Sequence, residues 1–395
     1  MPAVERICVF AQLHLPGLGD LLLRNALLAL VRRAHPDASV TLVVGDTLAT
    51  QFAELLDRHM YLTDVLRCPD PYDQTAESWL TFMRELADRD YQLCVVDPDS
   101  HLLDAGHARA AGIGQRLAQP RGELSDQDIT HPVRLAATRF ATPDLYEVMC
   151  GYAVTLGLDG SLRPADVVPD LPRWPEELPE LDAVRPRIVV HPGGAVRFNR
   201  RWPLERFAEL CVRLVEQFGA SLYLLGTRAE AVELTLLRDQ VRGRHPGGVV
   251  QVAIDGSLNR SANLIAGADL LIGNDSGPGH LAAAVGTPSV IIYGPGSGMA
   301  WLARVYTRLR VVSRYTCRPL NRPLHHGLTD RSELPRRFRC ENGCTPRHQG
   351  PTRPLWQCEE GCEIEYQGPR GPYPKCLVEI DVAKVCASVT AALRH

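Results

Sequence analysis

Residues 273–288 read GNDSGPGHLAAAVGTP and directly follow the apolar residues LLI at 270–272. The apolar run predicts a buried strand ending near Asn274, and the small residues beyond it predict a helix from about His280. Between them, Ser276 and Gly277 predict a turn whose backbone amides could bind an anion at the helix N-terminus. A purely structural alternative is that the alanines serve close packing and that His280 is a satisfied helix-start histidine. Strand, glycine turn and helix in this order form the repeating unit of a doubly wound α/β fold.

The same alternation of strands and helices extends through both halves of the chain. RICVFAQ opens the first half as a buried strand followed by an apolar helix, and RIVVHPGG opens a second series after a stretch rich in proline and acid. We therefore expect an α/β fold with two Rossmann-like doubly wound domains. The expected divisions are an N-terminal acceptor-side domain at 1–160, a linker at 161–186, a C-terminal nucleotide-sugar-binding domain at 187–314, an irregular insertion rich in cysteine and arginine at 315–376 and a closing helix at 377–395.

Composition excludes several classes of protein. The chain has 395 residues, a hydrophobic fraction of 45% and a formal net charge of -3, which is typical of a folded protein without the basic field of a nucleic-acid-binding protein. The N-terminal residues do not resemble a signal peptide, and no apolar run is long enough to cross a bilayer. We therefore expect a cytoplasmic protein without a transmembrane segment.

The first candidate site is the sequence GLGDLLL, which begins at Gly17. Gly17 and Gly19 allow a tight turn from strand to helix, and Asp20 stands at the start of the helix. Asp20 could be a helix N-cap, because aspartate is a preferred cap whatever the function. It could also serve as a general base in a cleft next to the carboxyl end of the sheet.

The second candidate site follows the strand that opens the C-terminal half. His191 is followed by Gly193 and Gly194, and Arg200 lies a few residues further on. Bare backbone amides together with a guanidinium group suit a diphosphate. The alternative is a solvated turn with surface arginines, which are common.

A third candidate is Glu230 in LLGTRAEAVE, where a strand ends and a helix starts. A glutamate in the first turn ordinarily complements the helix dipole. A carboxylate at the carboxyl end of a strand can also accept hydrogen bonds from ribose hydroxyls.

These segments resemble glycosyltransferase family 9, the family of bacterial ADP-heptose lipopolysaccharide heptosyltransferases. NDSGPGHLAAAVGTP is similar to the signature of that family. GLGDLLLRNALLAL, RRWPLERFAEL and LLGTRAEAVE resemble its other motifs in the same order, and CLVEIDVAKV resembles its closing segment. The resemblance covers residues 5–300 and implies a GT-B architecture, in which two Rossmann-like domains face each other across the active site.

The resemblance also implies a reaction and roles for residues. It implies inverting sugar transfer from a nucleoside-diphosphate sugar, ADP-heptose or another, without a metal ion, with Asp20 as the base that deprotonates the acceptor hydroxyl. Arg200 then stands beside the leaving diphosphate. The turn of Asp275, Ser276 and Gly277 holds the diphosphate and donor sugar with His280 beside it, Gly193 and Gly194 line the donor site, and Glu230 takes the ribose.

Six cysteines in or at the end of the 315–376 insertion form a separate cluster. Two CxxxC pairs, Cys340 with Cys344 and Cys358 with Cys362, could hold a structural zinc ion through four thiolates. Disulfides and plain buried thiols are the alternatives. Catalysis itself is expected to need no cofactor.

Four functions remain open at this point. The preferred one is a family 9 transferase that acts on a small molecule, such as a secondary-metabolite scaffold in natural product biosynthesis, because a slightly acidic chain suits an anionic lipid poorly. Its nearest rival is a true lipopolysaccharide heptosyltransferase with a glycolipid acceptor. A nucleic-acid-binding zinc protein belongs to another class, and the sparse aromatic residues of the insertion disfavour it. The last possibility is a GT-B relative that cleaves or epimerises a nucleotide sugar, because a fold does not fix a function.

Overall fold

The computed structural model describes most of both predicted domains. The described residues are 4–13, 17–70, 75–100, 102–135, 144–159, 161–171, 180–194, 200–254, 256–294, 302, 305–313, 365–368 and 371–394. The chain forms two compact units, and the boundary between them falls at residues 172 and 173, inside the predicted linker 161–186.

The N-terminal domain is built on a six-stranded parallel sheet with the strand order β3-β2-β1-β4-β5-β6. Its strands are β1 (Arg6–Phe10), β2 (Ser39–Gly45), β3 (Asp64–Cys68), β4 (Leu93–Val96), β5 (Gln115–Ala118) and β6 (His131–Pro132). Its helices are α1 (Leu18–Ala34), α2 (Asp46–Gln51), α3 (Ala53–Asp57), α4 (Ala76–Asp88), α5 (Ala105–Ala110) and α6 (Leu145–Thr155), with 3-10 turns η1 (Leu124–Asp128) and η2 (Pro164–Val167).

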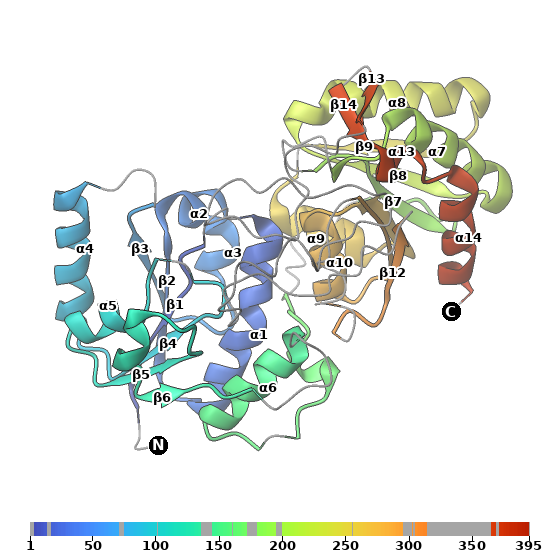
Figure 1. The fold of residues 1–395 in the computed structure, drawn as a ribbon. Coiled ribbons are helices and arrows are strands. Elements are labelled where there is room, and N and C mark those ends of the chain that lie inside the picture. The colour runs from blue at the N-terminus through green and yellow to red at the C-terminus, as the bar shows by residue number, and fades with distance from the viewer. Residues whose placement is uncertain are drawn as a thin grey trace. The chain divides into compact units, whose positions relative to one another are not determined.

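Helices cover both faces of this sheet. In Figure 1, α1 and α6 lie on one face and α4 and α5 on the other. Alternate residues of the strands, such as Cys8 and Phe10 of β1, pack with Phe82 and Leu86 of α4 in one apolar core. Strands buried on both sides in this way read as continuous apolar runs, which is why the sequence predicts them.

The C-terminal domain repeats the same topology with the order β12-β11-β10-β7-β8-β9, again parallel throughout. Its strands are β7 (Arg187–His191), β8 (Ser221–Leu225), β9 (Val250–Ala253), β10 (Leu270–Asn274), β11 (Ser289–Tyr293) and β12 (Leu309–Ser313). Its helices are α7 (Leu204–Phe218), α8 (Ala231–Arg244), α9 (Leu258–Ala266), α10 (Gly277–Val285), α13 (Lys375–Val378) and α14 (Val382–Leu393), with a 3-10 turn η5 (Arg228–Glu230). The prediction of two doubly wound domains is confirmed.

The core of the C-terminal domain joins distant parts of the chain. Strand residues such as Ile188 and Ile272 pack with α7, α8 and α14 on one face of the sheet (Figure 1). Trp202 is completely buried in this core, and its indole Nε1 donates a hydrogen bond to the Ile380 carbonyl oxygen at 3.0 Å. The closing helix predicted at 377–395 is therefore an integral part of this domain.

Two predictions about elements differ from the structure. Helix α10 begins at Gly277 rather than at His280, because Ser276 and Pro278 already have a helix-start arrangement. The segment 315–376, expected to be irregular, contains an antiparallel hairpin of β13 (Glu365–Gly368) and β14 (Gly371–Pro374) and the start of α13.

Among the described residues, no helix is both long and apolar enough to span a membrane.

Candidate functional site: the carboxyl edge of the C-terminal sheet

The candidate donor site lies where β7 and β10 end side by side. The strands β8 and β9 follow β7 in one direction and β11 and β12 follow β10 in the other, so the chain order of the sheet reverses between β7 and β10. Ligands of open α/β sheets bind at such switch points, beyond the carboxyl ends of the strands. His191 ends β7 and is buried, and its Nδ1 donates a hydrogen bond to the Leu225 carbonyl oxygen at 2.9 Å. This histidine is therefore part of the framework of the site.

Asn274, at the end of β10, fixes the loop that follows β7. Its Nδ2 donates hydrogen bonds to the carbonyl oxygens of Pro192 at 2.8 Å and Gly193 at 2.9 Å. Its Oδ1 accepts a hydrogen bond from the Trp202 backbone N–H at 2.9 Å. The Asn274 side chain is 1% exposed, and its amide group makes all three of these hydrogen bonds. It therefore connects the end of β10 with the loop at 192–193 and with Trp202. The sequence analysis treated Asn274 only as a strand end and missed this role.

Glu230 supports the same loop from the side of β8. Its carboxylate accepts hydrogen bonds from the Thr227 N–H at 2.8 Å, the Thr227 hydroxyl at 2.9 Å and the Gly194 N–H at 3.3 Å. Burial raises the pKa of Glu230, but these hydrogen bonds and the neighbouring His191 lower it, and the net shift is downward. The carboxylate therefore stays ionised and shapes the loop directly, whereas its predicted contact with a ribose stays a prediction.

Gly193 and Gly194 leave no room for side chains beside this carboxylate. A Cβ atom on Gly193 would overlap the Glu230 carboxylate, and Gly194 has a φ of 148°, which favours glycine. A Cβ atom on Gly194 would come within 3.7 Å of Ser276 Cβ, so the two glycine turns adjoin. The structure thus brings together the predicted donor residues of three separate segments.

Replacing Gly193 by alanine should destabilise the C-terminal domain by about 1–3 kcal/mol, because the new methyl group must displace Glu230 or the loop. Urea unfolding of the variant measures this loss, and titration with ADP should show weaker binding as well. Gly247→Ala is the matched control, since a Cβ atom there meets nothing within 4 Å. Equal stability of the two variants would contradict this account of the loop.

The N-terminus of α10 faces the same edge of the sheet. Ser276 is the N-cap residue, and its hydroxyl donates to the Asn274 carbonyl oxygen at 3.2 Å instead of capping the helix. The Ser276 side chain makes no capping hydrogen bond to the first turn of α10. Pro278 has no N–H and the Gly279 N–H donates to the Ser276 carbonyl oxygen at 3.0 Å, so Gly277 contributes the N–H at the helix start, where the helix dipole favours an anion.

Asp275 and Arg200 lie next to this helix N-terminus. The Arg200 Nη1 is 3.9 Å from the Asp275 Oδ2, and both side chains are about four-fifths buried, with 23% and 22% exposed. Burial raises the pKa of Asp275, while the Arg200 charge and a hydrogen bond from Tyr293 lower it, and the net shift is upward. A guanidinium beside a helix N-terminus suits a diphosphate, and a carboxylate suits the hydroxyl groups of a sugar.

His280 lies in the first turns of α10. Its Nδ1 is 2.9 Å from the Tyr306 hydroxyl, and the two rings pack edge to face. Burial lowers the pKa of His280 to about 4, so the ring is neutral at physiological pH. This geometry is compatible with both interpretations of His280. It can be a structural histidine at the helix start with Tyr306 as its hydrogen-bond partner, or a residue of the donor site.

Asp20, Gly17 and Gly19 belong to the N-terminal domain. Helix α1 begins at Leu18 with Gly17 as N-cap, so Asp20 is the third helical residue and not the N-cap. Its Oδ2 accepts a hydrogen bond from the Gly17 N–H at 3.1 Å, which closes the first turn, and the residue is exposed. An exposed carboxylate at the start of a helix remains accessible to a substrate hydroxyl.

A buried ion cluster lies one turn further along α1. Arg24 Nη1 donates to Asp97 Oδ1 at 2.5 Å and Arg24 Nη2 to Asp99 Oδ2 at 2.7 Å, and the Arg24 and Asp97 side chains are each 2% exposed. Burial raises the pKa of Asp97, although the Arg24 charge pulls it down. Sequence reasoning missed this cluster, for which the available signals were an arginine in an apolar helix and the acidic residues directly after β4.

The predicted zinc ligands Cys340, Cys344, Cys358 and Cys362 lie outside the described residues. Within the described residues, no group of histidine, cysteine and acidic side chains could hold a metal ion. Among the described residues, five cysteines are buried and one, Cys150, is partly buried; the buried ones are Cys8, Cys68, Cys94, Cys211 and Cys386.

Known proteins with the same architecture include several heptosyltransferases. The structure of the E. coli ADP-heptose lps heptosyltransferase II has a TM-score of 0.64 at 18% identity, and the match covers 99% of both chains. The E. coli heptosyltransferase WaaC with ADP has a TM-score of 0.53 at 18% identity, over 74% of this chain and 88% of that one. These likenesses confirm the predicted GT-B fold.

Sequence similarity to a known family covers part of the chain. Residues 153–319 match the model of glycosyltransferase family 9 (heptosyltransferase). Lipopolysaccharide heptosyltransferase 2 of Salmonella typhimurium is 28% identical over 172 residues, which are 40% of this chain and 49% of that protein. Lipooligosaccharide heptosyltransferase 2 of Haemophilus influenzae is 31% identical over 137 residues, 35% of this chain and 39% of that protein. The chain thus spans about half the length or less of these relatives, and its residues 153–319 are similar to glycosyltransferase family 9, the heptosyltransferase family.

Proposed function

We propose that this protein is an inverting glycosyltransferase that moves a sugar, heptose or hexose, from a nucleoside-diphosphate donor to an acceptor hydroxyl without a metal ion. The observation that carries the proposal is the switch-point site, where the N-terminus of α10 and Arg200 adjoin the glycine loop held by Asn274 and Glu230. Such a site is suited to a diphosphate, and it lies in the segment that matches family 9.

The proposed reaction assigns one role to each part of the site. Asp20 accepts the proton of the acceptor hydroxyl, and the resulting oxygen attacks the anomeric carbon of the donor sugar. The bond between that carbon and the diphosphate oxygen breaks, and its electron pair leaves with the nucleoside diphosphate. Arg200 and the amides of α10 stabilise the negative charge that develops there. Asp275 and His280 contact the donor sugar, and Glu230 contacts the ribose.

The relatives support ADP-heptose as the donor. They are lipopolysaccharide and lipooligosaccharide heptosyltransferases, and a related solved structure is an ADP-heptose enzyme. For the acceptor we propose a small molecule, such as a secondary-metabolite scaffold, because a chain with a net charge of -3 attracts anionic lipids poorly. A glycolipid acceptor of the lipopolysaccharide type is the second candidate, which the names of the relatives favour.

A thermal-shift panel of ADP, GDP, UDP and dTDP tests the donor part of the proposal. A ligand that binds only the folded state stabilises it by about 2.7 kcal/mol at a hundredfold excess over its Kd. ADP should raise the midpoint more than the other three, and EDTA should not change that shift. A panel in which no nucleotide raises the midpoint would remove the basis for a nucleotide-sugar transferase.

A further inference from the structure

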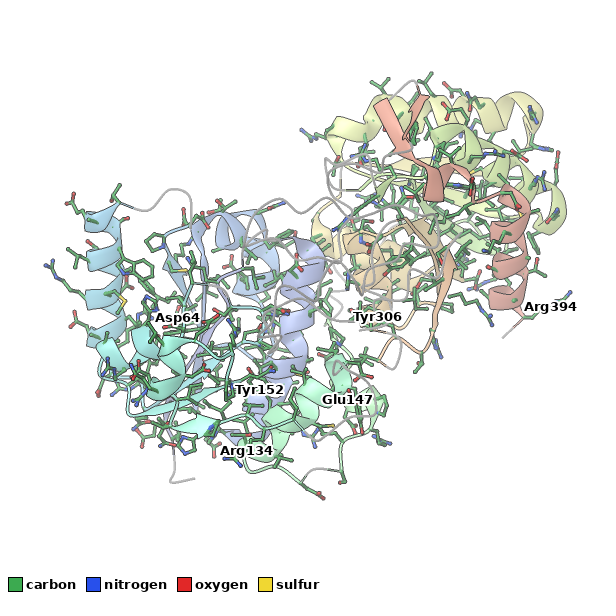
Figure 2. The ribbon with its side chains drawn as sticks, viewed as in Figure 1. Asp64, Arg134, Glu147, Tyr152, Tyr306 and Arg394 are labelled. Carbon is green, nitrogen blue, oxygen red and sulfur yellow. The ribbon has the colours of Figure 1, made fainter. Side chains whose placement is uncertain are left out.

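A small pocket beside α10 contains two tyrosine hydroxyls that have no part in the reaction as proposed so far. Its lining comprises Asp275, Ser276, Gly279, His280, Ile291, Tyr293, Tyr306 and Leu309. Tyr293 ends β11 and Tyr306 precedes β12, and both are 5% exposed. Figure 2 labels Tyr306 in the C-terminal domain, near α10 and β12. The pocket has room for about one water molecule, which is also the space of one hydroxyl group.

The contact between Tyr306 and His280 involves the ring nitrogen Nδ1, and the group that donates in this hydrogen bond determines the tautomer of the imidazole. Burial raises the pKa of Tyr306, so its hydroxyl keeps the proton and can donate it in a hydrogen bond. The neutral His280 ring has one acceptor nitrogen and one N–H donor. With Tyr306 donating to Nδ1 across 2.9 Å, the proton of the ring is on Nε2. His280 then offers a hydrogen-bond donor through Nε2.

Tyr293 acts in the same way on the other side of the pocket. It lines the pocket together with Asp275, and its hydroxyl and the Arg200 guanidinium, 3.9 Å from Asp275 Oδ2, both favour the ionised carboxylate. A fixed carboxylate accepts from hydroxyl groups, and a fixed N–H donates to hydroxyl oxygens. Because a carboxylate repels a diphosphate, the pair of Asp275 and His280 is suited to the sugar and the α10 amides to the diphosphate.

We propose that Tyr306 is a positioning residue for the donor sugar: its buried hydroxyl holds His280 in the Nε2–H form, and His280 then donates a hydrogen bond to a hydroxyl oxygen of the sugar. Asp275, which lines the same pocket beside Tyr293, is the acceptor for the same sugar. This inference rests on the proposed transferase function. It adds that the pocket contributes to the affinity for a nucleotide sugar but not to the affinity for the bare nucleotide, because neither tyrosine is assigned a contact with the diphosphate.

Calorimetric titration of Tyr306→Phe with ADP and with ADP-heptose tests the inference. The variant should bind ADP with the wild-type Kd and ADP-heptose about 3- to 10-fold more weakly, the cost of one hydrogen bond. Tyr223→Phe is the matched control: Tyr223 is a buried tyrosine of β8 whose hydroxyl accepts a hydrogen bond from the Asp182 N–H at 2.7 Å. This control variant should bind both ligands as the wild type does.

Nitrogen NMR of the histidine rings gives a readout that a merely structural role would not change. His280 of the wild-type protein should show the Nε2–H tautomer, and Tyr306→Phe should show a mixture of tautomers. An Nδ1–H tautomer in the wild type would overturn the inference even if the variant does not fold. Equal weakening of ADP and ADP-heptose by Tyr306→Phe also overturns it and leaves the proposed function standing, whereas a wild-type protein that binds no ADP overturns both.

Discussion

Asp20→Asn should reduce sugar transfer by about 10²- to 10⁴-fold, the contribution typical of a general base, while the affinity for ADP stays at the wild-type value. Asparagine keeps an oxygen that can accept the hydrogen bond from the Gly17 N–H, now 3.1 Å from Asp20 Oδ2. The first turn of α1 therefore stays capped, and the substitution removes the basic group alone. Turnover with ADP-heptose and a panel of small-molecule and glycolipid acceptors measures the first quantity, and calorimetry measures the second.

A second helix start in the same domain provides the control for Asp20. Asp144 is the N-cap of α6, and its Oδ1 accepts a hydrogen bond from the Glu147 N–H at 2.9 Å. Asp144→Asn makes the same chemical change at a comparable position, and we expect transfer within twofold of wild type. Wild-type turnover by Asp20→Asn would show that another group accepts the proton.

Arg24→Met should destabilise the N-terminal domain by about 3–5 kcal/mol, because it leaves a buried carboxylate without its counter-charge. Asp97 and the Arg24 side chain are each 2% exposed, so water cannot replace the lost 2.5 Å hydrogen bond. Asp99, at 30% exposed, can be solvated and should contribute less. Urea unfolding followed by a probe in the N-terminal domain measures the loss.

Two further variants separate charge from packing in this cluster. The double variant Arg24→Met, Asp97→Leu removes both charges and should recover much of the lost stability, because apolar residues of similar volume can replace a buried ion pair. Arg67→Met breaks a pair with Asp46 in which both side chains are more than half exposed, and should cost much less. A surface ion pair contributes less than about 1 kcal/mol to the free energy of unfolding. If Arg24→Met alone lowers the free energy of unfolding by no more than that, Asp97 is neutral or solvated.

The sequence predicts the fold well because the fold depends on local patterns. Continuous apolar runs such as that of β7 predict strands buried on both faces, and glycine turns after them predict strand-to-helix junctions. The ends of elements are less well predicted. The N-cap alternative for Asp20 is wrong, because Gly17 is the N-cap and Asp20 lies three residues after it. Helix α10 begins at Gly277 rather than at His280. Both helix starts depend on backbone hydrogen bonds that composition does not reveal.

The supports of the site could not be predicted, because they depend on which strands become neighbours. Asn274 reaches the loop after β7 only because β10 pairs with β7, although they are far apart in the chain. Arg24 meets Asp97 because β4 pairs with β1, next to which α1 packs. The sequence pattern predicts which residues lie at strand ends. The order of the strands in the sheet determines which of these residues come into contact.

Hydrogen exchange followed by mass spectrometry, with and without ADP, tests most directly that the switch point of the C-terminal sheet is the donor site. Peptides that contain residues 191–194, 226–230 and 274–280 should exchange more slowly when ADP is bound, because the backbone amides of these loops would contact or enclose it. Peptides of α14 should exchange as before. Protection confined to other segments, or no protection at saturating ADP, would contradict the account.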